Sequence, residues 1–112
     1  MKAMKVIVSD FLPFRGFAAI NLFGIIIARK DRLPLSQRIL HHEAIHTHQI
    51  RELFYIGFYG WYIVEWLFRL IYYRNSKEAY KNICFEREAF CNDVNPNYLK
   101  QRKRYAFLHY IK

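Results

Sequence analysis

Acidic residues are scarce in this chain of 112 residues, in which nine Asp and Glu oppose 18 Lys and Arg and give a formal net charge of +9. Such a charge attracts nucleic acid, anionic lipid and acidic proteins alike. The sequence has no RNA-binding consensus and no recognisable helix-turn-helix, and it has no glycine-rich phosphate loop. A nucleic-acid partner would rest on charge alone, so we expect none.

Cysteine is also rare, with only Cys84 and Cys91 present. They stand seven residues apart on one predicted helix, about 10 Å along its axis, which is too far for a disulfide. We therefore expect free, partly buried thiols in a reducing compartment. The N-terminus lacks the long apolar segment and cleavage site of a signal peptide, and we predict a cytoplasmic protein.

A long uncharged apolar run is missing too. The segment Leu53–Tyr73 is long enough to span a bilayer, but its uncharged part ends at Val64, and Glu65 and Arg69 follow. Those two residues are four apart and can pair on one helix face. The pattern favours a core helix. Peripheral contact with the surface of the inner membrane stays open, because Tyr, Trp and flanking Arg are typical of interfaces.

Apolar residues are abundant, since 54% of the chain is hydrophobic and 19% is aromatic. This composition predicts one folded domain over residues 1–112. Strands are predicted at Lys5–Val8 and Gly24–Lys30, with a turn or loop at Phe11–Phe23 between them. We therefore expect an α+β fold that starts with a small β-element of two or three strands, such as a hairpin.

Helices are expected after the breaker at Asp31–Pro34. The first begins near Pro34 or Ser36, and Asn75 or Ser76 caps the third. Asn95 and Pro96 restart the chain as the cap and first residue of the fourth. The four predicted helices cover about residues 34–53, 53–73, 77–92 and 96–110.

Four of the five histidines lie in the segment HHEAIHTHQ, residues 41–49. His42 and His46 belong to the predicted inward stripe of the first helix, one turn apart, so that they can bind one Zn²⁺ together. Glu43 is rotated about 100° around the helix and suits a general base toward water that the ion activates. His41 and His48 lie off the stripe, and we expect them to be solvated.

A third metal ligand is needed to complete such a site. Glu86 is the best candidate, because it shares a predicted apolar stripe with Ile83 and Phe90, and a buried carboxylate needs a partner. The alternative for Glu86 is a buried salt bridge with Arg38 or Arg69.

The segment HHEAIHTHQ, followed some forty residues later by FEREAF, resembles the gluzincin metallopeptidases with their H-E-x-x-H and E-x-x-A motifs. The likeness is to the minimal single-domain minigluzincins, which are similar to the catalytic core of HtpX-type and Ste-type proteases. It implies that His42, His46 and Glu86 bind zinc and that Glu43 is the general base and acid.

The same resemblance gives Ala89 the role of a small residue that lets two helices approach closely. It also marks a departure, because Phe90 stands where many relatives of the HtpX type carry an aspartate that supports the ligand histidines. Another group must then orient the imidazoles. His109, Tyr105 and Arg102 are candidates for stabilising the oxyanion, although no motif singles out any of them.

The expected function is a zinc-dependent peptidase that hydrolyses peptide bonds in a peptide or protein substrate. We expect the substrate to add as a strand along Gly24–Lys30. The alternative is a binding protein without peptidase activity, either stapled by a structural zinc or helical and membrane-peripheral. A fourth protein ligand, His41 or His48, would favour the structural zinc.

Overall fold

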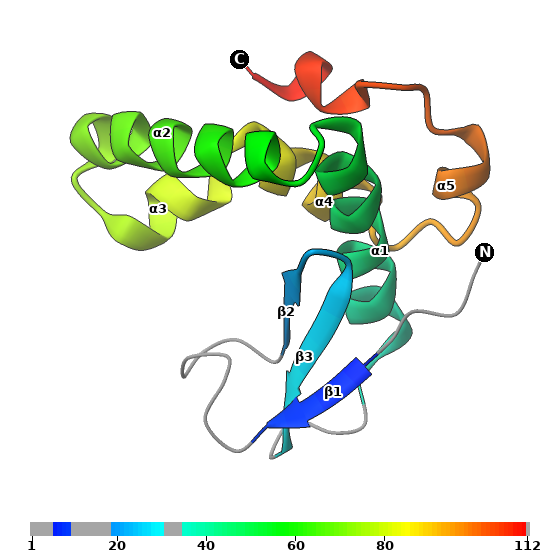
Figure 1. Cartoon of the computed structure of the whole chain (residues 1–112). Coiled ribbons are helices and arrows are strands. Elements are labelled where there is room, and N and C mark those ends of the chain that lie inside the picture. Colours follow the sequence, from blue (N-terminus) through cyan, green and yellow to red (C-terminus); the bar gives the residue numbers. More distant parts are fainter. Residues whose placement is uncertain (1–5, 10–18, 31–34, 112) are drawn as a thin grey trace.

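A computed structural model of the chain describes residues 6–9, 19–30 and 35–111 (Figure 1). A small sheet comes first and helices follow, which confirms the predicted α+β class. The strands are β1 (Val6–Ser9), β2 (Ala19–Leu22) and β3 (Ile25–Arg29). The helices are α1 (Gln37–Glu52), α2 (Ile56–Tyr73), α3 (Ser76–Lys81), α4 (Cys84–Asn92) and α5 (Tyr98–Gln101), with a 3-10 helix, η2, at Ala106–Tyr110.

The sheet has the strand order β1-β3-β2. β1 pairs with β3 in parallel, and β2 pairs with β3 antiparallel. The two strands predicted from the sequence are therefore both present, but they do not form a hairpin with each other. The hairpin consists of β2 and β3, and β3 is the central strand.

The prediction of a turn or loop over residues 11–23 is wrong for Ala19–Leu22, which form β2, while residues 11–18 lie outside the described residues. Phe23 and Gly24 make the tight turn to β3, with φ angles of 55° and 90°. A two-residue hairpin turn requires such positive φ values, and phenylalanine gives no sequence signal for one. Asparagine is typical of loops, but the Asn21 side chain donates hydrogen bonds to Glu43 and Thr47 of α1.

The helix that carries the histidines begins as predicted. The Ser36 side chain caps α1 by accepting a hydrogen bond from the Ile39 amide at 3.1 Å. In Figure 1, α1 runs from the sheet up to the remaining helices. It therefore contacts both β2 and α4, which brings the sheet and the second half of the chain to its histidines.

Helix α2 begins at Ile56 rather than Leu53, because Phe54 and Tyr55 have positive φ angles of 55° and 65° and form a turn. Glu65 and Arg69 pair at 3.2 Å as predicted. No helix within the described ranges is both long and apolar enough to cross a membrane.

The predicted helix over residues 77–92 is divided in two. Asn75 caps α3 as expected, but α3 ends at Lys81, and Ile83 is extended with ψ at 136°. The Glu65 carboxylate accepts a hydrogen bond from the Cys84 amide at 2.9 Å, at the start of α4. A hydrogen bond from α2 thus stabilises the start of a new helix, at a point where the local sequence predicts one continuous helix.

The predicted fourth helix, residues 96–110, is also wrong, since only α5 and η2 are helical there. Arg102 has an extended backbone between them and turns its side chain toward Glu52 and Glu88. Tyr105 follows with a φ of 58°, and its amide donates to Glu52. Arg102 and Tyr105 thus make long-range contacts to Glu52 and Glu88 in the segment where a continuous helix was predicted.

Two apolar clusters support this arrangement. The larger one is built on Ile50, Phe58, Phe85 and Phe107, and the smaller one joins β3 to the start of α1. Both cysteines are free as predicted, Cys84 buried and Cys91 exposed.

Candidate metal centre

His42 and His46 project from the same side of α1 and are both buried. They stand one turn apart, and their Nε2 atoms lie 3.2 Å from each other. Helical spacing of four residues places two imidazoles on one face in this way. The predicted inward stripe of α1 is therefore present, with the two ring nitrogens directed at a common point.

Glu86 reaches this point from α4. Its Oε1 lies 3.0 Å from His42 Nε2 and 3.2 Å from His46 Nε2. Ala89 is completely buried, consistent with a small residue at the place where α4 approaches α1. Two helices separated by more than thirty residues of sequence thus supply three ligand atoms to one small volume.

The three residues fit a tetrahedral ion. A metal bound at 2.0–2.1 Å by imidazole nitrogen and carboxylate oxygen places its ligand atoms about 3.3 Å apart, and the separations here are 3.0, 3.2 and 3.2 Å. Among the described residues, His42, His46 and Glu86 form the one group of this kind, and all three are buried. They could therefore hold a metal ion.

A separate cavity of about 250 Å³ contains His41 and His48, together with Asn92 and Lys100. These two histidines lie on a different side of α1, and both are half-buried rather than solvated as predicted. Neither belongs to the metal group. The described residues thus offer three protein ligands rather than the four of a closed structural zinc site.

The other ring nitrogen of each histidine has its own acceptor. His42 Nδ1 lies 3.0 Å from Asp93 Oδ2, and His46 Nδ1 lies 2.7 Å from Gln49 Oε1. The Gln49 amide nitrogen already donates to the Phe85 carbonyl, so Gln49 Oε1 must be the acceptor. Each Nδ1 therefore carries a hydrogen, so that Nε2 is the atom that faces the centre and can bind a cation once it has lost its own proton.

Asp93 provides the carboxylate that supports His42, which many relatives of the HtpX type carry at the position of Phe90. The Phe90 ring packs 4.5 Å from the His42 ring, and the supporting carboxylate comes from three residues later, just beyond α4. Asp93 also pairs with Arg38 at 2.9 Å. Because Arg38 binds Asp93 and Arg69 binds Glu65, the alternative of a Glu86 salt bridge with either arginine is wrong.

Glu43 lies beside the group in a cavity of about 370 Å³, which His46 and Glu86 also line. Burial raises the pKa of Glu43, and the neighbouring His46 and His42 only partly oppose this effect. A carboxyl group whose pKa is moved toward neutrality can both accept and return a proton. The placement and environment of Glu43 therefore suit the predicted general base.

The charges of Glu86 and His46 determine each other's protonation. Burial opposes protonation of His46, but the Glu86 carboxylate outweighs it and raises the pKa of His46 to about 9. Burial also acts to raise the pKa of Glu86, yet the charges and hydrogen bonds of His46 and His42 hold it well below its usual range. Glu86 is thus an anion, which is the form that binds a cation.

Tyrosines that sequence reasoning did not select complete the cavity. Tyr62 donates a hydrogen bond to Glu86 Oε2 at 2.7 Å, and Tyr59 and Tyr80 line the same space. Burial is the main cause that raises the pKa of both Tyr62 and Tyr80, so their phenols stay protonated. Their positions follow from the packing of α2 on α1 and of α3 on α2, which no local motif records.

The predicted oxyanion candidates Arg102, Tyr105 and His109 are not among the residues that line this cavity. Arg102 instead forms ion pairs with Glu52 at 2.8 Å and with Glu88 at 2.6 Å. Its basic side chain is therefore neutralised inside the protein rather than offered to an anionic partner.

Asn21 connects the sheet to the metal centre. Its side-chain amide donates to the Glu43 carbonyl at 2.9 Å and to Thr47 Oγ1 at 2.7 Å, and its Oδ1 accepts from the Gly24 amide. The hairpin turn is thus fixed to α1 at the predicted general base.

The edge expected to receive a substrate strand is not free, because β3 pairs with β1 on one side and with β2 on the other. Ile20 and Asn21 of β2 line the cavity, so an added strand would have to lie against β2. A comparison of the chain with protein families, with curated proteins and with solved structures found no match. The candidate metal centre therefore rests on this chain's own residues.

Proposed function

We propose that this protein is a zinc-dependent peptidase of the gluzincin type that hydrolyses peptide bonds in peptide or protein substrates. The observation that carries the proposal is the convergence of His42, His46 and Glu86 at tetrahedral separations, with the buried Glu43 beside them. Three protein ligands leave one position for water or substrate, as in catalytic zinc sites.

Zinc bound by these residues would act as a Lewis acid toward water and the scissile carbonyl. Glu43 accepts the proton of the attacking water and returns it to the leaving amine, for which its raised pKa is suited. Asp93 and Gln49 hold the two imidazoles in their orientation through Nδ1. Tyr62 holds the Glu86 carboxylate in place through the hydrogen bond that its phenol donates to Oε2.

The choice of peptides as substrates has a geometric basis. The β2 edge passes the cavity, and an extended peptide can add to such an edge through main-chain hydrogen bonds. The cavity walls include Ile20, Ile50 and Phe58, so we expect a preference for an apolar side chain near the scissile bond.

The test combines zinc analysis with a peptidase assay. We expect the purified wild type to hold one zinc per chain and to cleave a mixture of fluorogenic peptides. Glu43→Gln should keep the zinc and lose activity by at least about a hundredfold, whereas Glu86→Gln should lose both.

Glu78→Gln is the matched control, since Glu78 is exposed on α3 and outside the cavity. It should keep both zinc and activity. Full zinc retention by Glu86→Gln would contradict the ligand assignment, and unchanged cleavage by Glu43→Gln would contradict the mechanism. Zinc binding without cleavage of any peptide would favour the binding protein stapled by zinc.

A further inference from the structure

Helix α2 has two unlike faces. Toward the protein it packs Phe58, which is 4% exposed, and the half-buried Tyr62 and Trp66 against the core. Away from the protein it presents large apolar side chains to solvent. We call these the outer face of α2: Ile56, Ile63, Leu67, Phe68, Ile71 and Tyr72, whose exposed fractions run from 48% to 81%.

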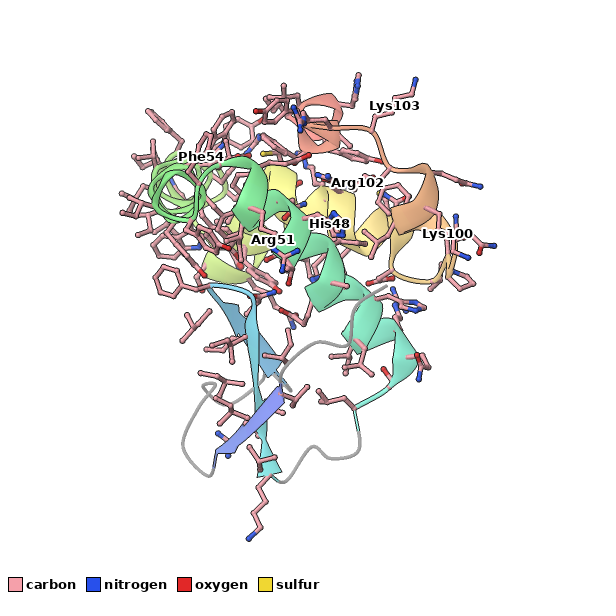
Figure 2. All side chains as sticks on the ribbon, turned by 45° about the vertical axis from the view of Figure 1, so that its right-hand side comes forward. His48, Arg51, Phe54, Lys100, Arg102 and Lys103 are labelled. Atoms are coloured by element: carbon pink, nitrogen blue, oxygen red, sulfur yellow. The ribbon has the colours of Figure 1, made fainter. Side chains whose placement is uncertain are left out.

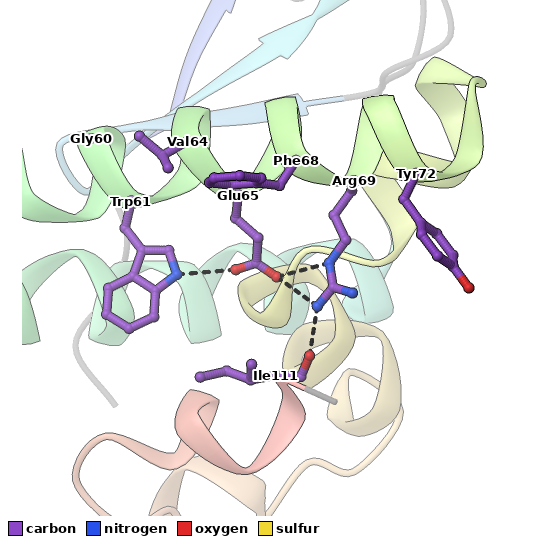
Figure 3. A pocket seen from close by; sticks show the side chains of 8 residues that line it. All are labelled: Gly60, Trp61, Val64, Glu65, Phe68, Arg69, Tyr72 and Ile111. Atoms are coloured by element: carbon purple, nitrogen blue, oxygen red, sulfur yellow. Dashed lines mark hydrogen bonds and ion pairs between the residues drawn. The ribbon is translucent and has the colours of Figure 1, made fainter.

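None of these six side chains is charged, and Phe68 and Tyr72 border a pocket that they line together with Glu65 and Arg69 (Figure 3). Helix α2 has only two ionisable groups that are charged at neutral pH, Glu65 and Arg69, and both lie on the side turned toward the C-terminal segment (Figure 3). They bind each other, and Arg69 also donates to the Ile111 carbonyl. A solvated helix face normally carries charged residues, so this face is built for an apolar surrounding.

The apolar surface continues past the start of α2. Phe54 is 83% exposed and stands at the end of the helix (Figure 2), where side chains of α2 project away from the rest of the molecule. Phe23 in the β2–β3 turn is also exposed, and its ring lies 5.0 Å from that of Tyr59. Tyr59 lines the cavity beside the metal centre, so the apolar surface reaches the edge of that cavity.

The charges around the apolar surface favour an anionic partner. Among the described residues, the exposed acidic side chains amount to Glu78 alone, whereas exposed Lys and Arg are spread over the molecule. Arg51 lies one turn before Phe54, and Arg74 caps the C-terminal end of α2. A second copy of the chain would bring like charges together around the face. An anionic lipid surface would satisfy both the apolar side chains and the flanking cations.

We propose that the outer face of α2 docks this protein onto the surface of an anionic lipid bilayer. The helix lies in the plane of the interface, because its opposite face packs on the core cluster as far as Trp66 and α2 also contacts α3. Ile63, Phe68 and Ile71 enter the boundary between headgroups and acyl chains, and the arginines at the two ends contact lipid phosphates. Docking does not depend on the proposed peptidase activity.

The test is co-sedimentation of the full chain with lipid vesicles. Vesicles of equal parts phosphatidylcholine and phosphatidylglycerol should bind the protein at least about tenfold more tightly than pure phosphatidylcholine, and added salt should reduce the difference. The variant Phe68→Gln/Ile71→Gln should bind the mixed vesicles at least about tenfold more weakly. Both substituted residues are 70% or more exposed, so circular dichroism should be unchanged.

Val8→Gln/Val94→Gln is the matched control, because it removes two exposed apolar side chains on β1 and after α4. It should bind within about twofold of the wild type. Should the α2 double variant fail to fold, the single variants Phe68→Gln and Ile71→Gln replace it with the same direction of change.

Three outcomes would overturn the proposal. The first is a failure of the wild type to bind either kind of vesicle. The second is equal binding by the wild type and the Phe68→Gln/Ile71→Gln variant, which would leave simple charge attraction. The third is a wild-type dimer in light scattering that this variant dissociates, with no vesicle binding, since the outer face would then be an interface between two copies.

Discussion

Asp93 and Gln49 determine which nitrogen of each histidine faces Glu86. A neutral imidazole has one N–H and one lone pair, and an acceptor at Nδ1 assigns the lone pair to Nε2. Both acceptors lie within 3.0 Å of their Nδ1 atoms, and both are fully or almost fully buried. The candidate ligands are therefore oriented without an ion, which would lower the cost of binding one.

Removing the charge of one acceptor tests this orientation. In Asp93→Asn the amide can still occupy the position next to His42 Nδ1, but the carboxylate that supports the imidazole and binds Arg38 is lost. We expect zinc affinity to fall about 10–100-fold, the usual effect of losing such a partner. The measurement is competition with a chromophoric chelator at fixed pH.

Arg38→Gln serves as the control for that experiment. The Arg38 side chain is 60% exposed and binds Asp93 on the side away from the ligand. Its loss should change zinc affinity by less than about threefold, since an exposed ion pair contributes little. An equal loss in both variants would mean that Asp93 acts through Arg38 and not on His42.

At the scale of elements, Glu65 decides where α4 begins. Its carboxylate accepts hydrogen bonds from the Cys84 amide, from Trp61 Nε1 at 3.0 Å and from Arg69. The first amides of a helix have no partner within it, so an acceptor there stabilises the start. Glu86 follows two residues after Cys84, and the break before α4 therefore sets the position of the third ligand.

Glu65→Ala should destabilise the protein by about 1–2 kcal/mol through the lost cap of α4. The loss of the ion pair with Arg69 should add to this destabilisation. Zinc affinity should fall with it, because the first turn of α4 carries Glu86. Urea unfolding and zinc competition measure the two effects. Glu78→Ala, at an exposed site in the first turn of α3, should stay within about 0.5 kcal/mol of the wild type.

The sequence patterns that repeat with the helical period predicted the elements best. The stripe of His42 and His46 is present on α1, and Ser36 and Asn75 are the predicted local caps. The stripe that predicted Glu86 is present only in part, because Ile83 precedes α4 and Phe90 is exposed. The break before Cys84 depends on a side chain 19 residues earlier in the chain. Asp93, Tyr62 and Asn21 likewise act across long sequence separations, and no local rule identifies such partners.

At the scale of the whole molecule, Arg102 joins the C-terminal segment to α1 and α4, the helices that carry the candidate metal ligands. It binds Glu52 at the end of α1 and Glu88 on α4, and its side chain is 3% exposed. Glu88 also accepts a hydrogen bond from Gln49, which supports His46. The side-chain contacts from Arg102 through Glu88 and Gln49 to His46 thus connect the last part of the sequence to the candidate metal centre.

Arg102→Met should destabilise the protein by about 3–5 kcal/mol, because it leaves the buried Glu88 without its cation. The double variant Arg102→Met/Glu88→Gln should recover part of that loss, since the buried charge is then removed as well. Urea unfolding of the zinc-free proteins measures both values. A loss below about 1 kcal/mol for Arg102→Met would contradict the role of this ion pair.

The same urea unfolding can be repeated in the presence of zinc. An ion that binds only the native state stabilises it by about 4 kcal/mol at a thousand times its dissociation constant. The wild type should therefore show a higher urea midpoint with zinc than after chelation, and Glu86→Gln should show no difference. In Arg102→Met the zinc-dependent gain should be smaller than in the wild type, because Glu88, which accepts from Gln49, loses the cation that holds it in place. An unchanged gain would show that the metal centre is held by α1 and α4 alone and that the C-terminal segment contributes only to global stability.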